Sequence, residues 1–204
     1  MSKSSHFLLI KAIDECLKNA ISFLSDAKLL MNEKSSYGHA FSLCVLADEE
    51  TAKAFFLKAV SQEILKYEDI QHHIYSHQSK LKIQILLELV EKTISSNLLE
   101  TLINLEPYYE EMRIQLVNNH FRRYRADIRK KREYLNKRKQ NGFYVEIKGD
   151  DVLSPNSFSE DETRSFYREV KSRLKMFKEF QKKNIKVPVE LLEVWKSEWV
   201  VDSL

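Results

Sequence analysis

Glycine, proline and cysteine are all scarce in this chain of 204 residues, which contains three Gly, three Pro and two Cys. So few turn-forming residues cannot connect the many short strands of a β-sandwich or barrel, and they cannot supply a glycine-rich phosphate loop. The chain is instead rich in Leu, Lys and Glu, with 43% apolar and 31% charged residues. This composition predicts an all-α protein of long helices with one buried core.

Long apolar runs are also missing. The longest, such as residues 7–10 and 43–47, fall far short of the roughly 20 residues that a membrane span needs. Lys11 ends the N-terminal FLLI run, and no small-residue cleavage pattern follows. Cys16 and Cys44 lack CxxC spacing, which predicts reduced core thiols rather than a disulfide or a zinc site. We therefore expect a cytoplasmic protein without a membrane partner.

The few breakers divide the chain into helical blocks. We predict helices over residues 6–32, 37–61, 69–95, 107–140 and 159–183, with a weaker turn of helix over 98–105 and a tail helix from Pro188. Asn141-Gly142 is a favourable helix stop, and Ser159 opens a capping region for the helix that follows. Residues 143–147, FYVEI, are the only strand-like run, and residues 149–159 are expected to form a loop. We expect one helical domain over 1–186 and a short tail over 187–204.

The first two helices have different apolar patterns. The first carries a single stripe at spacings of three and four: Leu9, Ile13, Cys16, Ala20, Leu24, Ala27 and Met31. The second contains FSLCVLA, which is apolar at six of seven positions and predicts a central helix that is buried nearly all round.

A polar cluster follows this apolar run directly. It consists of Asp48, Glu49, Glu50 and Lys53, and Glu50 and Lys53 can touch on one helix face. His77 and Lys80 have the same spacing on the third predicted helix, so a helical hairpin would bring them near Glu49 or Glu50. The cluster is either a buried salt-bridge network that pins this hairpin or a functional site at its seam.

Three strings in this order carry a family resemblance: SYGHAFSLCVLADEETAKAFFL, HQSK and KRKQNGFYVEI. Over about residues 5–185 the chain resembles the AbiV family of abortive-infection proteins, within the HEPN superfamily. The matching residues are Glu49, Glu50, Lys53, His77, Lys80, Arg138, Tyr144 and Val145. The resemblance implies a HEPN-like up-and-down helical bundle that blocks phage multiplication by arresting protein synthesis.

Many HEPN proteins are metal-independent ribonucleases that carry Arg, four to six further residues, and then His. This chain has Arg113-IQLVNN-His120 on its fourth predicted helix, where the superfamily carries its motif. Seven residues are close to two helical turns, about 10.5 Å along the axis, so both side chains share a face. The resemblance thus implies catalytic roles for Arg113 and His120 in a homodimer, with no cofactor and no metal.

Basic residues are concentrated in one segment. Residues 121–139 contain ten basic residues against Asp127 and Glu133, a local charge of +8 in a chain of net charge +3. We expect RNA to meet this segment, with Arg122, Arg123, Tyr124, Arg125 and Arg129 tracking its backbone. The other interpretation is a solvated helix flank.

Two functions remain open. The first is an endoribonuclease that cuts RNA through its 2′-OH and is triggered by a phage-encoded protein. The second is a non-catalytic helical module that binds RNA, a translation component or a phage protein. A di-iron bundle is excluded, because Asp69 and His72 supply only half of its ligand pattern.

Overall fold

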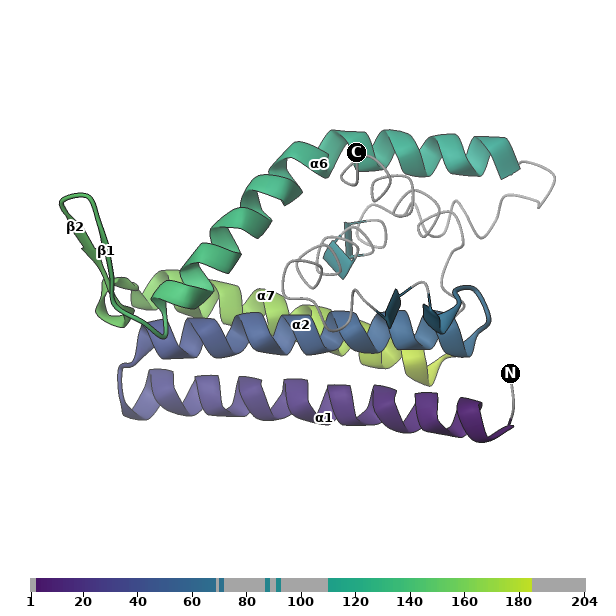
Figure 1. The fold of residues 1–204 in the computed structure, drawn as a ribbon, viewed down its shortest axis with the longest axis horizontal. Helices are drawn as coiled ribbons and strands as arrows, with labels where there is room; N and C mark the ends of the chain where they lie inside the picture. The colour runs from purple at the N-terminus through teal and green to yellow at the C-terminus, as the bar shows by residue number, and fades with distance from the viewer. Residues whose placement is uncertain (1–2, 69, 72–86, 89–90, 93–109, 185–204) are drawn as a thin grey trace.

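The computed structural model describes residues 3–68, 70–71, 87–88, 91–92 and 110–184. Long helices make up most of this part, and the sheet within it is a single two-stranded hairpin. Helices α1, α2 and α7 lie side by side, and α6 crosses to them from above (Figure 1). The predicted all-α fold class is therefore confirmed.

Helices α1 (Lys3–Glu33) and α2 (Tyr37–Ser61) form an antiparallel hairpin. The bounds of α2 are those predicted, and α1 begins three residues earlier than predicted. The whole predicted stripe of α1, from Leu9 to Met31, is buried. The short turn between the helices places Ser35 at a φ of 50°, and the Ser36 N–H donates to the Leu30 carbonyl over 3.0 Å.

Helix α2 is the centre of the core. Eighteen of its 25 residues are buried, as the apolar run predicted. Helix α7 (Glu160–Lys182) packs along it, and the Phe41 ring stacks on Phe166 with centroids 4.6 Å apart. Helix α7 begins at the predicted cap, where the Ser159 hydroxyl accepts the Glu162 backbone N–H at 3.2 Å. The predicted reduced thiols are also confirmed, because Cys16 and Cys44 are free and buried.

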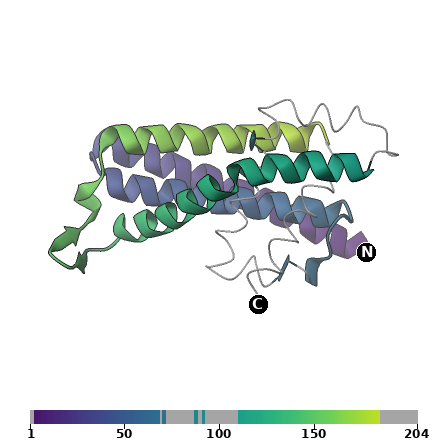
Figure 2. The ribbon, with the colours of Figure 1, turned by 90° about the horizontal axis from the view of Figure 1, so that it is seen from above.

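Helix α6 (Glu110–Asn141) starts away from the three packed helices and reaches them only with its C-terminal part (Figures 1 and 2). It ends at Asn141, next to the predicted stop at Gly142. A Cβ atom added to Gly142 would lie 2.1 Å from the Ser42 Oγ and 2.4 Å from the Gly38 carbonyl oxygen. Glycine at this position therefore allows α6 to end directly against α2.

The strand prediction needs a correction. The strand begins at residue 146 rather than 143, as β1 (Glu146–Lys148), and pairs with β2 (Asp151–Leu153) from the segment predicted to be a loop. Residues 143 and 144 are not extended, because their N–H groups bond back to the Gln140 carbonyl and close the end of α6. Gly149, at a φ of 61°, provides the two-residue hairpin turn. A 3₁₀ turn, η2 (Pro155–Ser157), leads into α7.

Other predictions fall mostly outside the described residues. Within the predicted helix over 69–95, the described pairs 70–71, 87–88 and 91–92 are helical. The weaker helical turn over 98–105 and the tail over 187–204 lie outside the described part, so the predicted domain division stays a prediction. In the part of the chain that the structure describes, every helix is too short or too polar to cross a membrane.

Candidate functional site

The acidic residues of the predicted polar cluster lie in the interior. Asp48 and Glu49, in the middle of α2, are 3% and 4% exposed. A carboxylate at such a position loses its hydration, a cost of several kcal/mol unless a cation replaces the water. The partners that the fold supplies therefore decide what this cluster can do.

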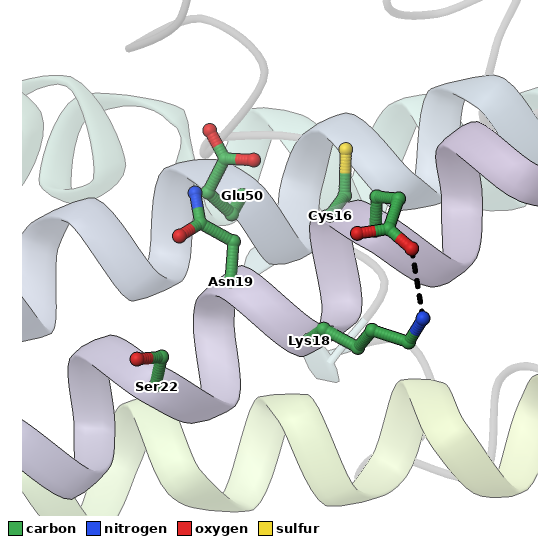
Figure 3. Close-up of a pocket in the computed structure, with 6 residues that line it drawn as sticks. Cys16, Lys18, Asn19, Ser22 and Glu50 are labelled. Atoms are coloured by element: carbon green, nitrogen blue, oxygen red, sulfur yellow. Dashed lines mark hydrogen bonds and ion pairs between the residues drawn. The ribbon is translucent and has the colours of Figure 1, made fainter.

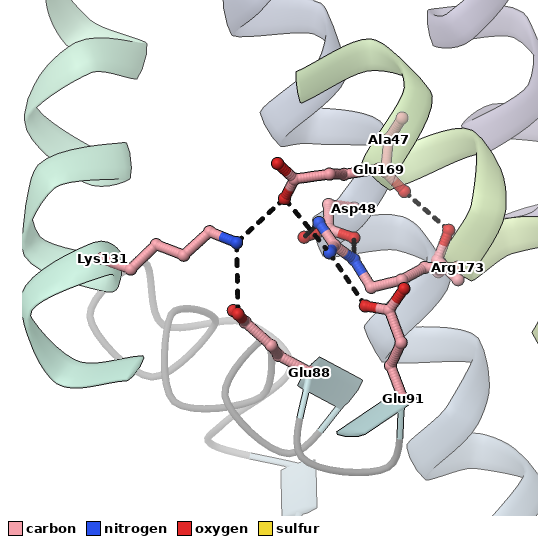
Figure 4. A network of polar contacts seen from close by, with 8 residues as sticks. Ala47, Asp48, Glu88, Glu91, Lys131, Glu169 and Arg173 are labelled. Carbon is pink, nitrogen blue, oxygen red and sulfur yellow. Dashed lines mark hydrogen bonds and ion pairs between the residues drawn. The ribbon is translucent and has the colours of Figure 1, made fainter. Parts of the chain in front are cut away.

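Asp48 is paired with an arginine of α7. The Arg173 Nε and Nη2 donate to the two oxygens of Asp48 over 2.8 and 3.1 Å, and Arg173 itself is 2% exposed. Its Nη1 also lies 3.1 Å from a carboxylate oxygen of Glu91 (Figure 4). Burial works to lower the pKa of Arg173, but the charge and hydrogen bonds of Asp48, together with the charges of Glu91 and Glu88, outweigh it and raise that pKa. This two-pronged pair holds α7 against the centre of α2.

Lys131 extends the network to α6. Its Nζ lies 3.1 Å from a Glu88 oxygen and 2.9 Å from a Glu169 oxygen, so it joins α6 to α7 and to the described helical residues 87–88 (Figure 4). Burial works to lower the pKa of Lys131, yet the two carboxylates outweigh it and the pKa is raised. Lys131 therefore stays charged at neutral pH.

Glu49 is paired with the last turn of α6. The Lys139 Nζ donates to its carboxylate over 2.5 Å, and both side chains are nearly inaccessible to water. The Ser42 hydroxyl donates to the Lys139 backbone carbonyl over 2.8 Å. Both contacts pin the end of α6 to α2 beside Gly142.

Arg138, one of the family-matching residues, joins the C-terminal part of α6 to α7. Its guanidinium donates to Glu162 of α7 over 3.1 and 2.6 Å and lies 3.5 Å from the centre of the Phe158 ring. Tyr134 also donates its hydroxyl to Glu162. Burial raises the pKa of Tyr134, and the bond to Glu162 adds to this.

Glu50 and Lys53 touch as predicted, with Nζ and Oε1 2.5 Å apart. Glu50 also lines a shallow polar depression between α1 and α2, together with Cys16 and Asn19 (Figure 3). Burial, with a smaller contribution from the charge of Glu50, raises the pKa of Cys16 to about 12. The Cys16 thiol is therefore protonated at neutral pH and is a poor nucleophile.

The predicted catalytic pair lies on one regular helix. Helix α6 is unbroken from Glu110 to Asn141, so Arg113 and His120 are two turns apart, as the spacing requires. The described neighbours Met112, Gln115 and Asn119 are exposed. The side chains of Arg113 and His120 themselves lie outside what the structure describes.

Of the other predicted site residues, some have side chains that the structure describes and others do not. Arg122 is exposed on α6, whereas the side chains of Arg123, Tyr124, Arg125 and Arg129 on that helix lie outside the described part. His77 and Lys80 also lie outside it, so their predicted contact with Glu49 or Glu50 stays a prediction. The ion pairs made by Glu49 and Glu50 within the described part are those with Lys139 and Lys53.

Sequence reasoning did not identify the partners Arg173 and Lys139. Arg173 had a detectable signal, because it interrupts the buried stripe of Phe166, Val170 and Phe177 at helical spacing. A charged residue inside an apolar stripe must find an opposite charge, and Asp48 interrupts α2 in the same way. Lys139 follows the buried Leu135 by four residues but is hidden within the basic run.

The described fold and site define an all-helical bundle whose central helix carries buried acids held by basic residues of two later helices. The sequence profile of HEPN_AbiV, described as AbiV, matches residues 8–175. The chain therefore belongs to the AbiV family of abortive-infection HEPN proteins, and the resemblance found in its motifs is confirmed. No curated protein and no solved structure matches it.

Proposed function

We propose that this protein is a cytoplasmic, metal-independent endoribonuclease of phage defence, in which Arg113 and His120 on α6 cut RNA and thereby arrest translation. The observation that carries the proposal is the continuity of α6, which keeps these residues two turns, about 10.5 Å, apart.

The rival site at the α2 cluster is less suited to chemistry. Asp48 and Glu49 are buried and already paired with Arg173 and Lys139. A substrate group would have to displace these buried cations before it could reach either carboxylate. The described part of the cluster therefore supports a structural role, which was one of its two interpretations from sequence.

The proposed reaction needs only side chains. A neutral His120 takes the proton of the ribose 2′-OH, whose oxygen attacks the adjacent phosphorus while the bond to the 5′-oxygen breaks. A protonated His120 from a second copy returns a proton to that 5′-oxygen, and Arg113 stabilises the negative charge of the phosphorane. The products are a 2′,3′-cyclic phosphate and a 5′-hydroxyl, so RNA and not DNA is the substrate.

The experiment is an RNA digest by purified wild-type protein, Arg113→Ala and His120→Ala at matched thermal stability. Arg168→Ala and His6→Ala replace exposed residues of the same types on α7 and α1 and serve as controls. We expect a loss of at least about 100-fold in cleavage for the first two variants and none for the controls. Cleavage and cell toxicity that survive both substitutions would contradict the proposal.

Two further readouts test the composite site. Histidine ordinarily titrates near pH 6.5, so one neutral and one protonated imidazole should give a bell-shaped rate profile centred near that value. Sedimentation should detect a dimer at micromolar concentration. If the chain binds RNA without cutting it under all of these conditions, the non-catalytic module becomes the better function.

A further inference from the structure

The outward face of α6 carries basic side chains in a row. Arg122, Lys130 and Lys137 are exposed and lie eight and seven residues apart, which places them on one stripe of the helix. The carboxylate of Glu133 shares this stripe. Among the described residues, no carboxylate oxygen lies within 4.0 Å of these three cations. Within the described part of the chain, their charge is therefore not paired with a carboxylate.

The hairpin adds a fourth cation at the C-terminal end of the row. Lys148 of β1 is exposed and lies beside Lys137; the proximity of its positive charge lowers the pKa of Lys137, and Glu146 opposes this only in part. Within the described chain, neither ammonium group has a carboxylate within 4.0 Å. An anionic group between the two lysines would relieve their repulsion.

An aromatic side chain lies close to these lysines in the chain. The side chain of Tyr144 is 71% exposed, whereas tyrosine side chains in folded proteins are intermediate in burial. Its ring makes an edge contact with Phe143 at 6.3 Å between centroids, and Phe143 contacts His39 of α2 at 6.2 Å. Tyr144 is thus supported by its neighbours while most of its surface stays free.

We propose that Lys137, Lys148 and Tyr144 form a binding site for single-stranded RNA, with Lys130 and Arg122 leading from it along α6. The two lysines each take a phosphate of the RNA backbone, and the Tyr144 ring stacks on an unpaired base. This inference rests on the proposed function for the identity of the ligand. The accessible charge favours RNA over a protein partner on the exposed apolar side chains Ile147 and Val152 of the hairpin.

The position of this site sets how far from the cut it holds the substrate. Lys137 follows His120 by 17 residues, which is about 25 Å along a helix. At about 3.4 Å per stacked nucleotide, this distance corresponds to about seven nucleotides. A fragment of about four nucleotides can therefore occupy only one of the two places at a time, whereas a longer RNA can reach both.

The test measures binding by fluorescence anisotropy in the cleavage-deficient His120→Ala protein, with a labelled single-stranded RNA of about 20 nucleotides. Lys137→Gln/Lys148→Gln should weaken binding about tenfold and reduce the slope of log affinity against log salt by about 1.4, since each phosphate contact contributes about 0.7. Tyr144→Ala should weaken it by about tenfold with the slope unchanged.

Lys175→Gln/Lys178→Gln, which removes two exposed lysines of α7, is the matched control and should leave affinity for the long RNA unchanged. Equal affinity and equal salt slope for Lys137→Gln/Lys148→Gln and this control would overturn the inference. Because cleavage is disabled, the outcome does not depend on whether Arg113 and His120 are catalytic. Wild-type protein that fails to cut RNA overturns the proposed function, while loss of long-RNA binding in the Lys137 variant still supports this site.

Discussion

The inward and outward faces of α6 carry the same kinds of basic side chain in different surroundings. Lys131, Arg138 and Lys139 face the other helices, and each is paired with a carboxylate. Arg122, Lys130 and Lys137 face outward and have none within 4.0 Å among the described residues. A run of charge in a sequence can thus serve the fold and a ligand at once, and the helical period separates the two roles.

The largest effect should come from breaking the most buried pair, Asp48 with Arg173. Arg173→Met leaves the Asp48 carboxylate charged in the interior, which should lower the free energy of unfolding by about 3–5 kcal/mol. Urea denaturation followed by circular dichroism measures this change.

Two variants complete this test. Asp48→Asn in the Arg173→Met background should recover part of the loss, because the uncompensated charge is gone. Arg164→Met breaks the exposed pair with Glu160 and should leave stability within experimental error. Equal losses for Arg164→Met and Arg173→Met would contradict the structural role of the buried network.

A smaller effect is expected where the inward face of α6 ends against α2. Gly142→Ala places a methyl group on the Ser42 hydroxyl and the Gly38 carbonyl, which should cost about 1–3 kcal/mol of stability. Ser42→Gly should not rescue it fully, since the Gly38 backbone remains in the way. Full rescue would mean that α6 is seated less closely than described.

The helices and their buried faces could be predicted because each rests on a local pattern. The stripe of α1 and the bounds of α2 follow from helical spacing and from breakers near the helix ends, as does the Ser159 cap of α7. Glu50 and Lys53 pair within one turn, so that contact was also local. Such features need no knowledge of the tertiary fold.

The partners of the buried acids could not be predicted in the same way. Asp48 and Arg173 are 125 residues apart, and Glu49 and Lys139 are 90 apart, so only the packing of α2 against α6 and α7 brings them together. The β1–β2 hairpin was predicted only in part, for a similar reason. The start of β1 depends on how residues 143 and 144 close the end of α6, and β2 has too few residues to show a strand pattern.

A further prediction concerns Lys131, which is partly exposed at the edge of the network. Lys131→Met should cost about 1 kcal/mol at neutral pH, a value limited by solvent screening. Its folded pKa is raised above the ordinary value near 10.4, so its stabilisation is complete below that pH and is lost as the pH rises further.

The free energy difference between wild type and Lys131→Met should therefore be constant from pH 7 to about 10 and shrink above it. Lys175→Met, at an exposed position of α7, should show no difference throughout. A difference that already disappears near pH 8 would mean that burial outweighs Glu88 and Glu169 and lowers the pKa of Lys131.

The most direct test of the division of α6 compares two lysines of that helix that are only two residues apart, Lys137 and Lys139. Lys139→Gln should lower Tm by about 5–10 °C, because Glu49 loses its buried partner. Lys137→Gln should leave Tm unchanged and weaken the binding of long single-stranded RNA severalfold, with a salt slope reduced by about 0.7. Both variants are measured by thermal unfolding and by RNA anisotropy. If the two substitutions changed Tm and RNA affinity alike, the division of α6 into a structural and an RNA-binding face would be contradicted.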